Sequence, residues 1–134
     1  MKNIILAILL ILTAIVAKST TFTVTSTGDS GPNTLRYALQ MCAASTGPHT
    51  INFNIPTTDA NYNSSTGVWI IVPSSDLPMI MQQGVTIDGT TQTAFAGDTN
   101  PYGPEIVIDG SNARDYGFRF MNAPNATLKG LNIR

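Results

Sequence analysis

The chain has 134 residues, a formal net charge of −1 and a hydrophobic content of 43%. It contains only 7 lysines and arginines, without a basic cluster, so an electrostatic nucleic-acid footprint is excluded and an anionic membrane surface is an equally poor partner. The single cysteine, Cys42, excludes an internal disulfide, and the fold must therefore be held together by its apolar core.

The N-terminus has the three parts of a secretory signal peptide. Lys2 provides a positive start, residues 4–17 form an apolar run without a charge, and Ala17 and Ser19 place small residues where a signal peptidase cleaves. A membrane anchor is the alternative, but a spanning helix needs about 17–25 apolar residues, more than this run supplies. We therefore predict a cleavable signal peptide over residues 1–19, a secreted or cell-surface location, and one mature domain over residues 20–134.

The mature part begins with an alternating segment and an amphipathic helix. Residues 21–25 alternate between polar and apolar side chains, which predicts a strand. A helical face is then predicted by apolar residues at positions i, i+3, i+4 and i+7. These residues are Leu35, Ala38, Leu39 and Cys42. Asn33 or Thr34 can cap the start of this helix, and Gly47-Pro48 can stop it.

The rest of the chain consists of short apolar segments between polar, turn-forming segments. Residues 68–72 form a continuous apolar run, which is typical of a strand buried on both sides, whereas residues 59–67 are polar and predict a loop. Because strand formers and turn formers dominate, the composition favours an all-β class. The predicted strands after the helix are 49–55, 68–72, 79–81, 85–87, 105–108, 118–121 and 126–133.

Two segments suggest an internal repeat. Residues 85–89 (VTIDG) match residues 106–110 (IVIDG), 21 positions later, and Ile108 is followed by Leu128 after a similar interval. Short strands that recur about every 20–25 residues predict a parallel β-solenoid, in which the early helix covers the exposed end. A β-sandwich with a chance recurrence of these residues is the alternative.

Several of these segments also resemble a known family. Residues 21–39 (TFTVTSTGDSGPNTLRYAL) resemble the opening of bacterial surface proteins with right-handed parallel β-helix repeats. Thr93-Ala94 departs from the pattern, where the family often has proline and glycine. The resemblance implies a pectate-lyase-like right-handed parallel β-helix with a short N-terminal capping helix. It also implies that the chain is an N-terminal fragment of a longer protein; a complete small protein is the weaker alternative. The resemblance continues at 50–56, 77–78, 85–92, 108–112 and 127–133.

Asp88 and Asp109 are the most prominent pair of candidate site residues. If they stack in neighbouring coils, their carboxylates lie about 5 Å apart, which is the spacing of adjacent strands. Such a pair could bind Ca²⁺ or act as acid and base in glycoside cleavage. Asp-Gly is also a favoured turn pair, and we expect both aspartates to stabilise turns.

Three further polar residues are expected to be structural. We expect Arg36 to pair with a nearby acid or to cover the end of the fold, although it could bind a substrate anion. His49 has no partner at metal-ligand spacing and is expected to lie in a turn. Cys42 is expected to be a buried, unreactive thiol on the apolar helix face.

Aromatic residues and asparagines provide the last candidates. Trp69 is expected in the core, and Tyr62 and Tyr102 are expected on surface loops, although all three could stack on sugar rings. Asn63 and Asn125 fit the N-glycosylation pattern, which has little meaning in a bacterial protein. We therefore predict no catalytic, cofactor-binding or metal-binding residue.

Two functions remain open at this stage. The first is an exported cell-surface β-helix protein with a structural, adhesive or glycan-binding role. The alternative is a polysaccharide lyase or glycoside hydrolase that would use Asp88, Asp109 and Arg114, with most of its active site beyond Arg134. The expected partner is a polysaccharide or cell-surface glycan. No cofactor is predicted, with Ca²⁺ at the two aspartates left open.

Overall fold

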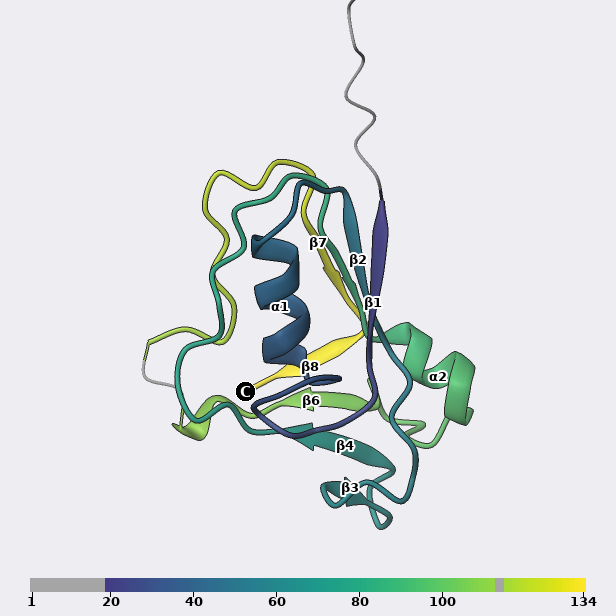
Figure 1. Ribbon diagram of the computed structural model, residues 1–134. Coiled ribbons are helices and arrows are strands. Elements are labelled where there is room, and N and C mark those ends of the chain that lie inside the picture. Colours follow the sequence, from purple (N-terminus) through teal and green to yellow (C-terminus); the bar gives the residue numbers. More distant parts are fainter. Residues whose placement is uncertain (1–18, 113–114) are drawn as a thin grey trace, which may run out of the picture.

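The computed structural model describes residues 19–112 and 115–134 (Figure 1). The predicted signal peptide lies outside these residues, apart from Ser19. None of the helices in the described ranges combines the length and the apolar character that crossing a membrane requires.

The described chain forms strands, two α-helices and one short 3-10 helix. Their order is β1 (Thr20–Val24), α1 (Leu35–Ala43), β2 (His49–Phe53), β3 (Tyr62–Asn63), β4 (Val68–Ile71), β5 (Thr86–Asp88), α2 (Thr90–Ala96), β6 (Ile106–Ile108), η1 (Gly110–Asn112), β7 (Thr127–Lys129) and β8 (Leu131–Ile133).

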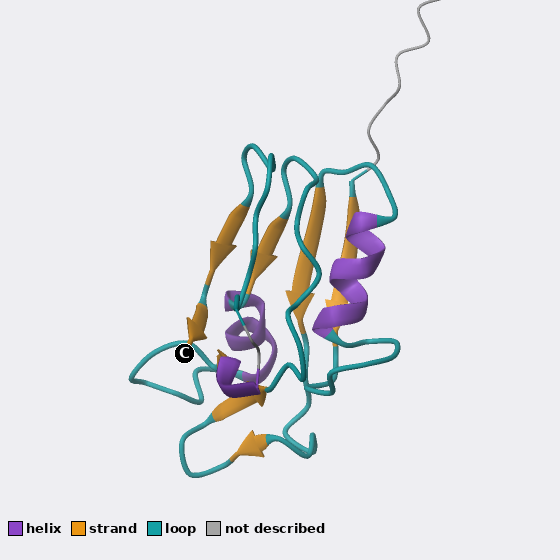
Figure 2. Ribbon diagram, turned by 90° about the vertical axis from the view of Figure 1, so that its left-hand side faces the viewer, coloured by secondary structure: helices purple, strands orange, loops and turns teal. Residues whose placement is uncertain are grey.

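The strands form two four-stranded sheets. The first sheet has the order β1-β2-β5-β7, and all of its neighbours are parallel. The second sheet has the order β3-β4-β6-β8, in which only the β3–β4 pair is antiparallel. Figure 2 shows the strands of the first sheet side by side, with the second sheet crossing below them. From β4 onward the chain alternates between the two sheets, so each sheet is assembled from segments that are distant in sequence.

Helix α1 forms where its apolar spacing predicts it. Thr34 is the N-cap, and its side-chain oxygen accepts a hydrogen bond from the backbone N–H of Tyr37 at 3.2 Å. The predicted apolar face is confirmed, because the buried residues of α1 are Leu35, Ala38, Leu39 and Cys42. The helix packs this face against β1 and β2, and it ends before Gly47-Pro48. Burying each leucine contributes about 1.5–3 kcal/mol.

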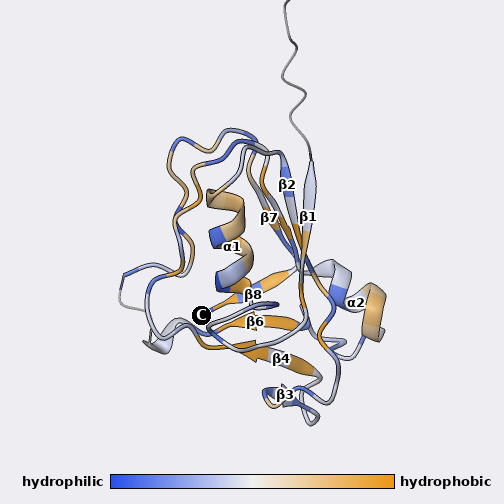
Figure 3. Ribbon diagram, viewed as in Figure 1, coloured by the Kyte–Doolittle hydropathy of each residue, from blue (hydrophilic) through white to orange (hydrophobic). Residues whose placement is uncertain are grey.

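The core lies between the two sheets and is closed on one side by α1. The inner faces of β1, β2 and β5 contribute side chains that are fully buried, as do β4 and β6, which Figure 3 shows as strongly hydrophobic. Trp69 is fully buried, which confirms its predicted core position. However, β4 is not buried on both sides throughout, because Ile70 is only half-buried. The apolar strand residues with 0% exposure are Val24, Ile51, Ile87, Trp69, Ile106 and Ile108.

The predicted all-β class and the right-handed parallel β-helix are wrong. The structure is a mixed α/β fold with two sheets of four mostly parallel strands and two short helices, without a solenoid. The two similar segments that suggested a repeat belong to different sheets, because β5 pairs with β2 and β7 whereas β6 pairs with β4 and β8. Ile87 therefore lies opposite Leu128 and not opposite Ile108. No repeat of about twenty residues is evident among the described strands, and α1 is a helix packed on β1 and β2 rather than the lid of a solenoid.

Some elements differ from those predicted. Strand β3 forms in a segment that had been expected to be a loop, and helix α2 was not among the predicted elements. The strands expected at 79–81 and 118–121 are reduced to a single parallel bridge between Ile80 and Phe120. The contacts of α2 and the Ile80–Phe120 bridge involve partners that are far away in sequence, which local periodicity does not register, whereas β3 pairs with the nearby β4.

Candidate functional site

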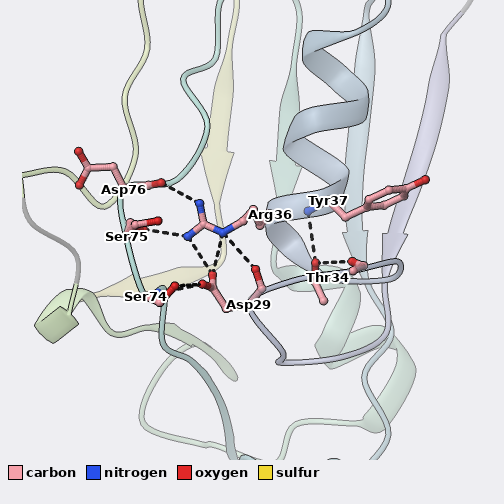
Figure 4. Close-up of polar contacts among 8 residues, drawn as sticks. Asp29, Thr34, Arg36, Tyr37, Ser74, Ser75 and Asp76 are labelled. Carbon is pink, nitrogen blue, oxygen red and sulfur yellow. Dashed lines mark hydrogen bonds and ion pairs between the residues drawn. The ribbon is translucent and has the colours of Figure 1, made fainter.

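Arg36 occupies a structural junction, as expected. Its guanidinium forms an ion pair with Asp29 at 2.9 Å and donates hydrogen bonds to the carbonyls of Ser75 and Asp76, both at 2.8 Å (Figure 4). The other oxygen of Asp29 accepts hydrogen bonds from the backbone N–H and the hydroxyl of Ser74. Partial burial opposes ionisation of Asp29, but the bonds from Ser74 and Arg36 outweigh it and lower the pKa of the carboxyl. The junction connects α1 to two loops, and the guanidinium of Arg36 is occupied by these structural contacts.

Asp88 and Asp109 do not form the predicted stacked pair. Asp88 is the last residue of β5 and Asp109 follows β6, which belongs to the other sheet. Each pairs with its own cation: Asp88 with Lys129 at 2.9 Å, and Asp109 with Arg134 at 3.0 Å. The calcium or acid–base pair proposed from sequence is therefore not assembled.

Both aspartates stabilise turns, which confirms the other expectation. Each accepts a hydrogen bond from the backbone N–H two residues later, that of Thr90 and that of Ser111. Burial opposes ionisation of Asp88, but hydrogen bonds from Lys129 and Thr90 outweigh it and lower its pKa. Hydrogen bonds from Ser111, followed by the bond from Arg134, lower the pKa of Asp109.

His49 and Cys42 are both buried. His49 begins β2 and is 1% exposed, so its predicted place in a turn is wrong. Its Nε2 lies 3.1 Å from the hydroxyl of Ser45. Cys42 is a buried thiol, as predicted, and burial raises its pKa to about 11. A thiol with so high a pKa contains very little of the reactive thiolate at neutral pH.

The remaining candidates are dispersed. The ring of Tyr62 packs on that of Trp69 with 4.5 Å between the centroids, whereas Tyr102 is 97% exposed, as expected for a surface loop. Asn63 and Asn125 are exposed. Arg114 lies outside the described residues. Within the described ranges, no three histidine, cysteine, aspartate or glutamate side chains are grouped so that they could hold a metal ion.

The outer face of the first sheet is a regular polar surface, which we call the polar face. Its side chains lie in two rows that cross all four strands in register, with about 4.8 Å between neighbouring strands. One row consists only of threonines, and the other changes from neutral to charged residues along the sheet. The rows are Thr21, Thr50, Thr86 and Thr127, and Thr23, Asn52, Asp88 and Lys129.

A groove lies where helix α2 meets the outer side of the first sheet, and we call it the α2 groove. Its cavity volume is about 310 Å³, within the range of small-ligand sites. The lining contains hydroxyl, amide and aromatic side chains but no charged one. The lining residues are Thr23, Asn52, Phe53, Asn54, Thr91, Ala94 and Phe95.

Side-chain bonds from α2 to the end of β2 fix the wall of this groove. The Thr91 hydroxyl accepts a hydrogen bond from the backbone N–H of Phe53 at 2.8 Å. The amide of Gln92 accepts from the N–H of Ile55 and donates to its carbonyl, both at 2.8 Å. Gln92 is fully buried. Since three bonds hold a helix of seven residues in place, the α2 groove is formed before any ligand arrives.

Two hydrogen-bond acceptors in the α2 groove have no partner. The Oδ1 atoms of Asn52 and Asn54 are buried and receive no hydrogen bond. Buried polar atoms in folded proteins nearly always have a partner, so these two acceptors are candidates for hydrogen bonds with donors from outside the protein. Beside them, the ring of Phe95 is 52% exposed. The groove therefore offers acceptors and an aromatic ring to a ligand.

Comparisons with known proteins identify no family. No family model, no curated protein and no solved structure matches the chain. The predicted membership of a bacterial β-helix surface family is corrected accordingly, since neither the comparisons nor the fold supports it.

Sequence reasoning missed the α2 groove for an identifiable reason. The alternation of residues 49–55 puts Asn52 and Asn54 on the face opposite the apolar Ile51 and Phe53. That signal could have identified two neighbouring amides on the outer face of a strand. It could not have brought Phe95 beside them, because this contact depends on the position of α2.

Proposed function

We propose that this chain is an exported cell-surface domain that binds neutral glycans in the α2 groove. The N-terminal signal pattern supports export. The groove supports glycan binding, because its chemistry complements that of a sugar ring: hydroxyls on the edge and C–H groups on the face.

The observation that carries the proposal is the pair of unpartnered Oδ1 atoms on Asn52 and Asn54. Sugar hydroxyls are donors, so each can satisfy one of these acceptors at the moment of binding. Leaving a buried acceptor unsatisfied costs about 1–3 kcal/mol. A ligand that supplies both donors removes two such penalties, which gives hydroxyl-rich molecules an advantage over apolar ones.

Phe95 supplies the second element of sugar recognition. Its exposed ring can stack on the C–H face of a pyranose, which is apolar, while the amides of Asn52 and Asn54 bind the hydroxyls. Because no residue in the lining carries a charge, the site favours neutral sugars over uronic acids or sulfated chains.

The polar face lets the site continue along the sheet. Its threonine row places one hydroxyl on each strand, so a glycan chain that leaves the α2 groove meets further donors and acceptors. This arrangement favours a polymer over a monosaccharide. The lyase or hydrolase alternative has no observation in its favour among the described residues, because its two aspartates are in different sheets and paired with cations.

The test is to titrate the mature domain with neutral and with acidic oligosaccharides and to measure the binding affinity by calorimetry. We expect a neutral oligosaccharide to bind, and we expect Phe95→Ala and Asn54→Ala each to weaken binding about tenfold, equivalent to about 1.4 kcal/mol. Tyr102→Ala is the matched control, because that ring is 97% exposed and is not part of the groove lining. Equal affinity in the Phe95→Ala and Tyr102→Ala variants would refute the groove as the binding site.

Export is tested separately. Mass spectrometry of the protein recovered outside the cell should show an N-terminus near residue 20. A protein that retains Met1 and stays with the membrane would contradict cleavage while leaving the glycan proposal intact.

A further inference from the structure

A second cavity lies between helix α2 and the loop that leads into β6, and we call it the acidic pocket. Its volume is about 320 Å³, and it shares no lining residue with the α2 groove. The polar side chains of its lining are carboxylates, hydroxyls and an amide, without an imidazole, a thiol or a basic group. These polar residues are Thr90, Thr93, Asp98, Asn100 and Glu105. The acidic pocket therefore presents oxygen atoms, which are the ligands that hard cations prefer.

Glu105 places a buried carboxylate without a counter-ion at the acidic pocket. The residue is only 4% exposed, and its Oε2 accepts a hydrogen bond from the hydroxyl of Thr93 at 2.6 Å. In the part of the chain that the structure describes, no cation pairs with this carboxylate and its Oε1 receives no hydrogen bond. Burying a carboxylate is costly unless it is paired or coordinates a metal ion. The Oε1 of Glu105 is therefore a candidate ligand atom for a cation in the pocket.

Asp98 gives the acidic pocket a second carboxylate. Its side chain is exposed, and within the described ranges it forms neither an ion pair nor a hydrogen bond. Two carboxylates that line one cavity repel each other, and the lining contains no lysine or arginine that could offset their charge. A cation bound between Asp98 and Glu105 would turn this repulsion into attraction.

The order of residues in this loop matches the first half of a calcium-binding loop. Asp98, Asn100 and Gly103 stand at positions 1, 3 and 6 of the pattern D-x-[DN]-x-[DN]-G, in which the first two supply oxygen ligands and the glycine allows a sharp turn. The loop departs from the pattern at position 5, which is Tyr102, and it brings its glutamate, Glu105, at position 8 rather than 12. The likeness therefore concerns the spacing of ligands and not a helix–loop–helix unit.

Hydrogen bonds within the protein hold these ligand residues in place. The side-chain amide of Asn100 donates to the carbonyl of Pro104 at 3.0 Å, and the backbone N–H of Gly103 donates to the carbonyl of Asn100 at 3.1 Å. The bond from Thr93 fixes the carboxylate of Glu105 from the side of α2. Because the ligands are ordered beforehand, an incoming ion loses little binding energy to ordering them.

We propose that the acidic pocket binds a calcium ion, with Glu105 and Asp98 as charged ligands and the side-chain oxygen of Asn100 as a neutral one. Ca²⁺ takes 6–8 oxygen ligands in a flexible geometry, so hydroxyls of the lining and water molecules fill the remaining positions. The site uses two carboxylates and neutral oxygens rather than a group of three acids, and it is separate from Asp88 and Asp109. A site with only two carboxylates, one of them exposed, is expected to bind with a Kd of about 10⁻⁴–10⁻³ M.

The test is to titrate the calcium-free mature protein with calcium chloride and to measure the binding affinity by calorimetry. Glu105→Gln should weaken binding at least about tenfold, because the amide can still accept the bond from Thr93 but lacks the charge. Asp98→Asn should weaken binding as well, and its exposed position leaves the fold intact. Asp115→Asn is the matched control, since Asp115 is an exposed acid outside the lining, and its variant should bind calcium like the wild type.

Thermal unfolding provides a second measurement. Because the ion binds only the folded protein, calcium at about 10 mM should raise the melting temperature of the wild type and of Asp115→Asn, but not that of Glu105→Gln. Circular dichroism without calcium checks that each variant is folded, and Asp98→Asn provides the comparison if Glu105→Gln is not. No binding to the wild type at about 10 mM calcium, wild-type affinity in both pocket variants, or equal weakening in Asp115→Asn would each overturn the proposal. Magnesium binding as tight as calcium binding would overturn the assignment of the ion.

Discussion

The side chain of Gln92 links α2 to the end of β2. It is fully buried, and its amide bonds to both the N–H and the carbonyl of Ile55. A backbone segment that leaves a parallel strand has lost its ladder partners, and here a side chain takes their place. This single residue therefore stabilises the turn after β2 and the wall of the α2 groove together.

We predict that Gln92→Leu lowers the free energy of unfolding by about 2–5 kcal/mol, because two buried backbone groups of Ile55 lose their only partners. Urea unfolding followed by circular dichroism measures the change. Gln83→Leu is the matched control, since Gln83 is exposed and should alter stability by less than about 0.5 kcal/mol. A loss of similar size in both variants would show that the amide bonds are not responsible.

Gly130 allows the backbone to lie close to Thr90. It joins β7 to β8 with a φ of 63°, and a Cβ there would lie 2.6 Å from Thr90. We predict that Gly130→Ala is destabilising by at least about 2 kcal/mol more than Gly31→Ala. Gly31 also has a positive φ, 86°, but has open space around it, so its variant reports backbone strain alone. Thermal unfolding of the two variants separates strain from crowding, and equal melting temperatures would contradict the crowding argument.

At the scale of elements, the apolar pattern that places α1 on the core is contained within the nine residues of the helix. Leu39 is 2% exposed and packs in the core, whereas Met41 on the same helix is 36% exposed. We predict that Leu39→Ala costs about 2–5 kcal/mol through the cavity that it leaves, and that Met41→Ala costs less than about 1 kcal/mol. Chemical denaturation of both variants provides the comparison, and a difference below about 1 kcal/mol would mean that α1 does not close the core.

The same contrast explains what the sequence could predict. The cap at Thr34 and the buried face of α1 were predictable because all their determinants lie within one short window. Helix α2 was not, because Gln92 is held by Ile55, which follows β2 and lies 37 positions earlier in the chain. The strands themselves were mostly found, but not their partners: nothing in the segment around Ile87 indicates that it pairs with Leu128 rather than Ile108. The α2 groove could be predicted only in part. The outward position of the amides of Asn52 and Asn54 follows from the alternation along β2, whereas the position of Phe95 depends on the tertiary structure.

At the scale of the whole molecule, the side chains of several aspartates link segments that are distant in sequence. Asp29 holds Ser74, and Asp59 accepts hydrogen bonds from the backbone N–H and the hydroxyl of Thr27. Asp88 and Asp109 join the last strands of the two sheets to their neighbours. In the described ranges, these four carboxylates connect loops and strand ends throughout the fold, which makes overall stability sensitive to their ionisation.

This dependence leads to a prediction for acid unfolding. Burial raises the pKa of Asp59, but hydrogen bonds from Thr27 and Asn61 outweigh it, and the net shift is downward, as it is for the other three acids. A carboxyl whose pKa is lower in the folded state stabilises the protein above its unfolded value of about 3.9 and loses that contribution as the pH falls through the folded value. We therefore expect the melting temperature to stay level from pH 7 to about 5 and to fall steeply below about pH 4. Asp59→Asn should lower the melting temperature at pH 7 and flatten the fall, whereas Asp98→Asn, at an exposed site, should leave the profile as it is. A wild-type melting temperature that is unchanged between pH 5 and pH 3 would refute the claim that these four ionised aspartates stabilise the fold.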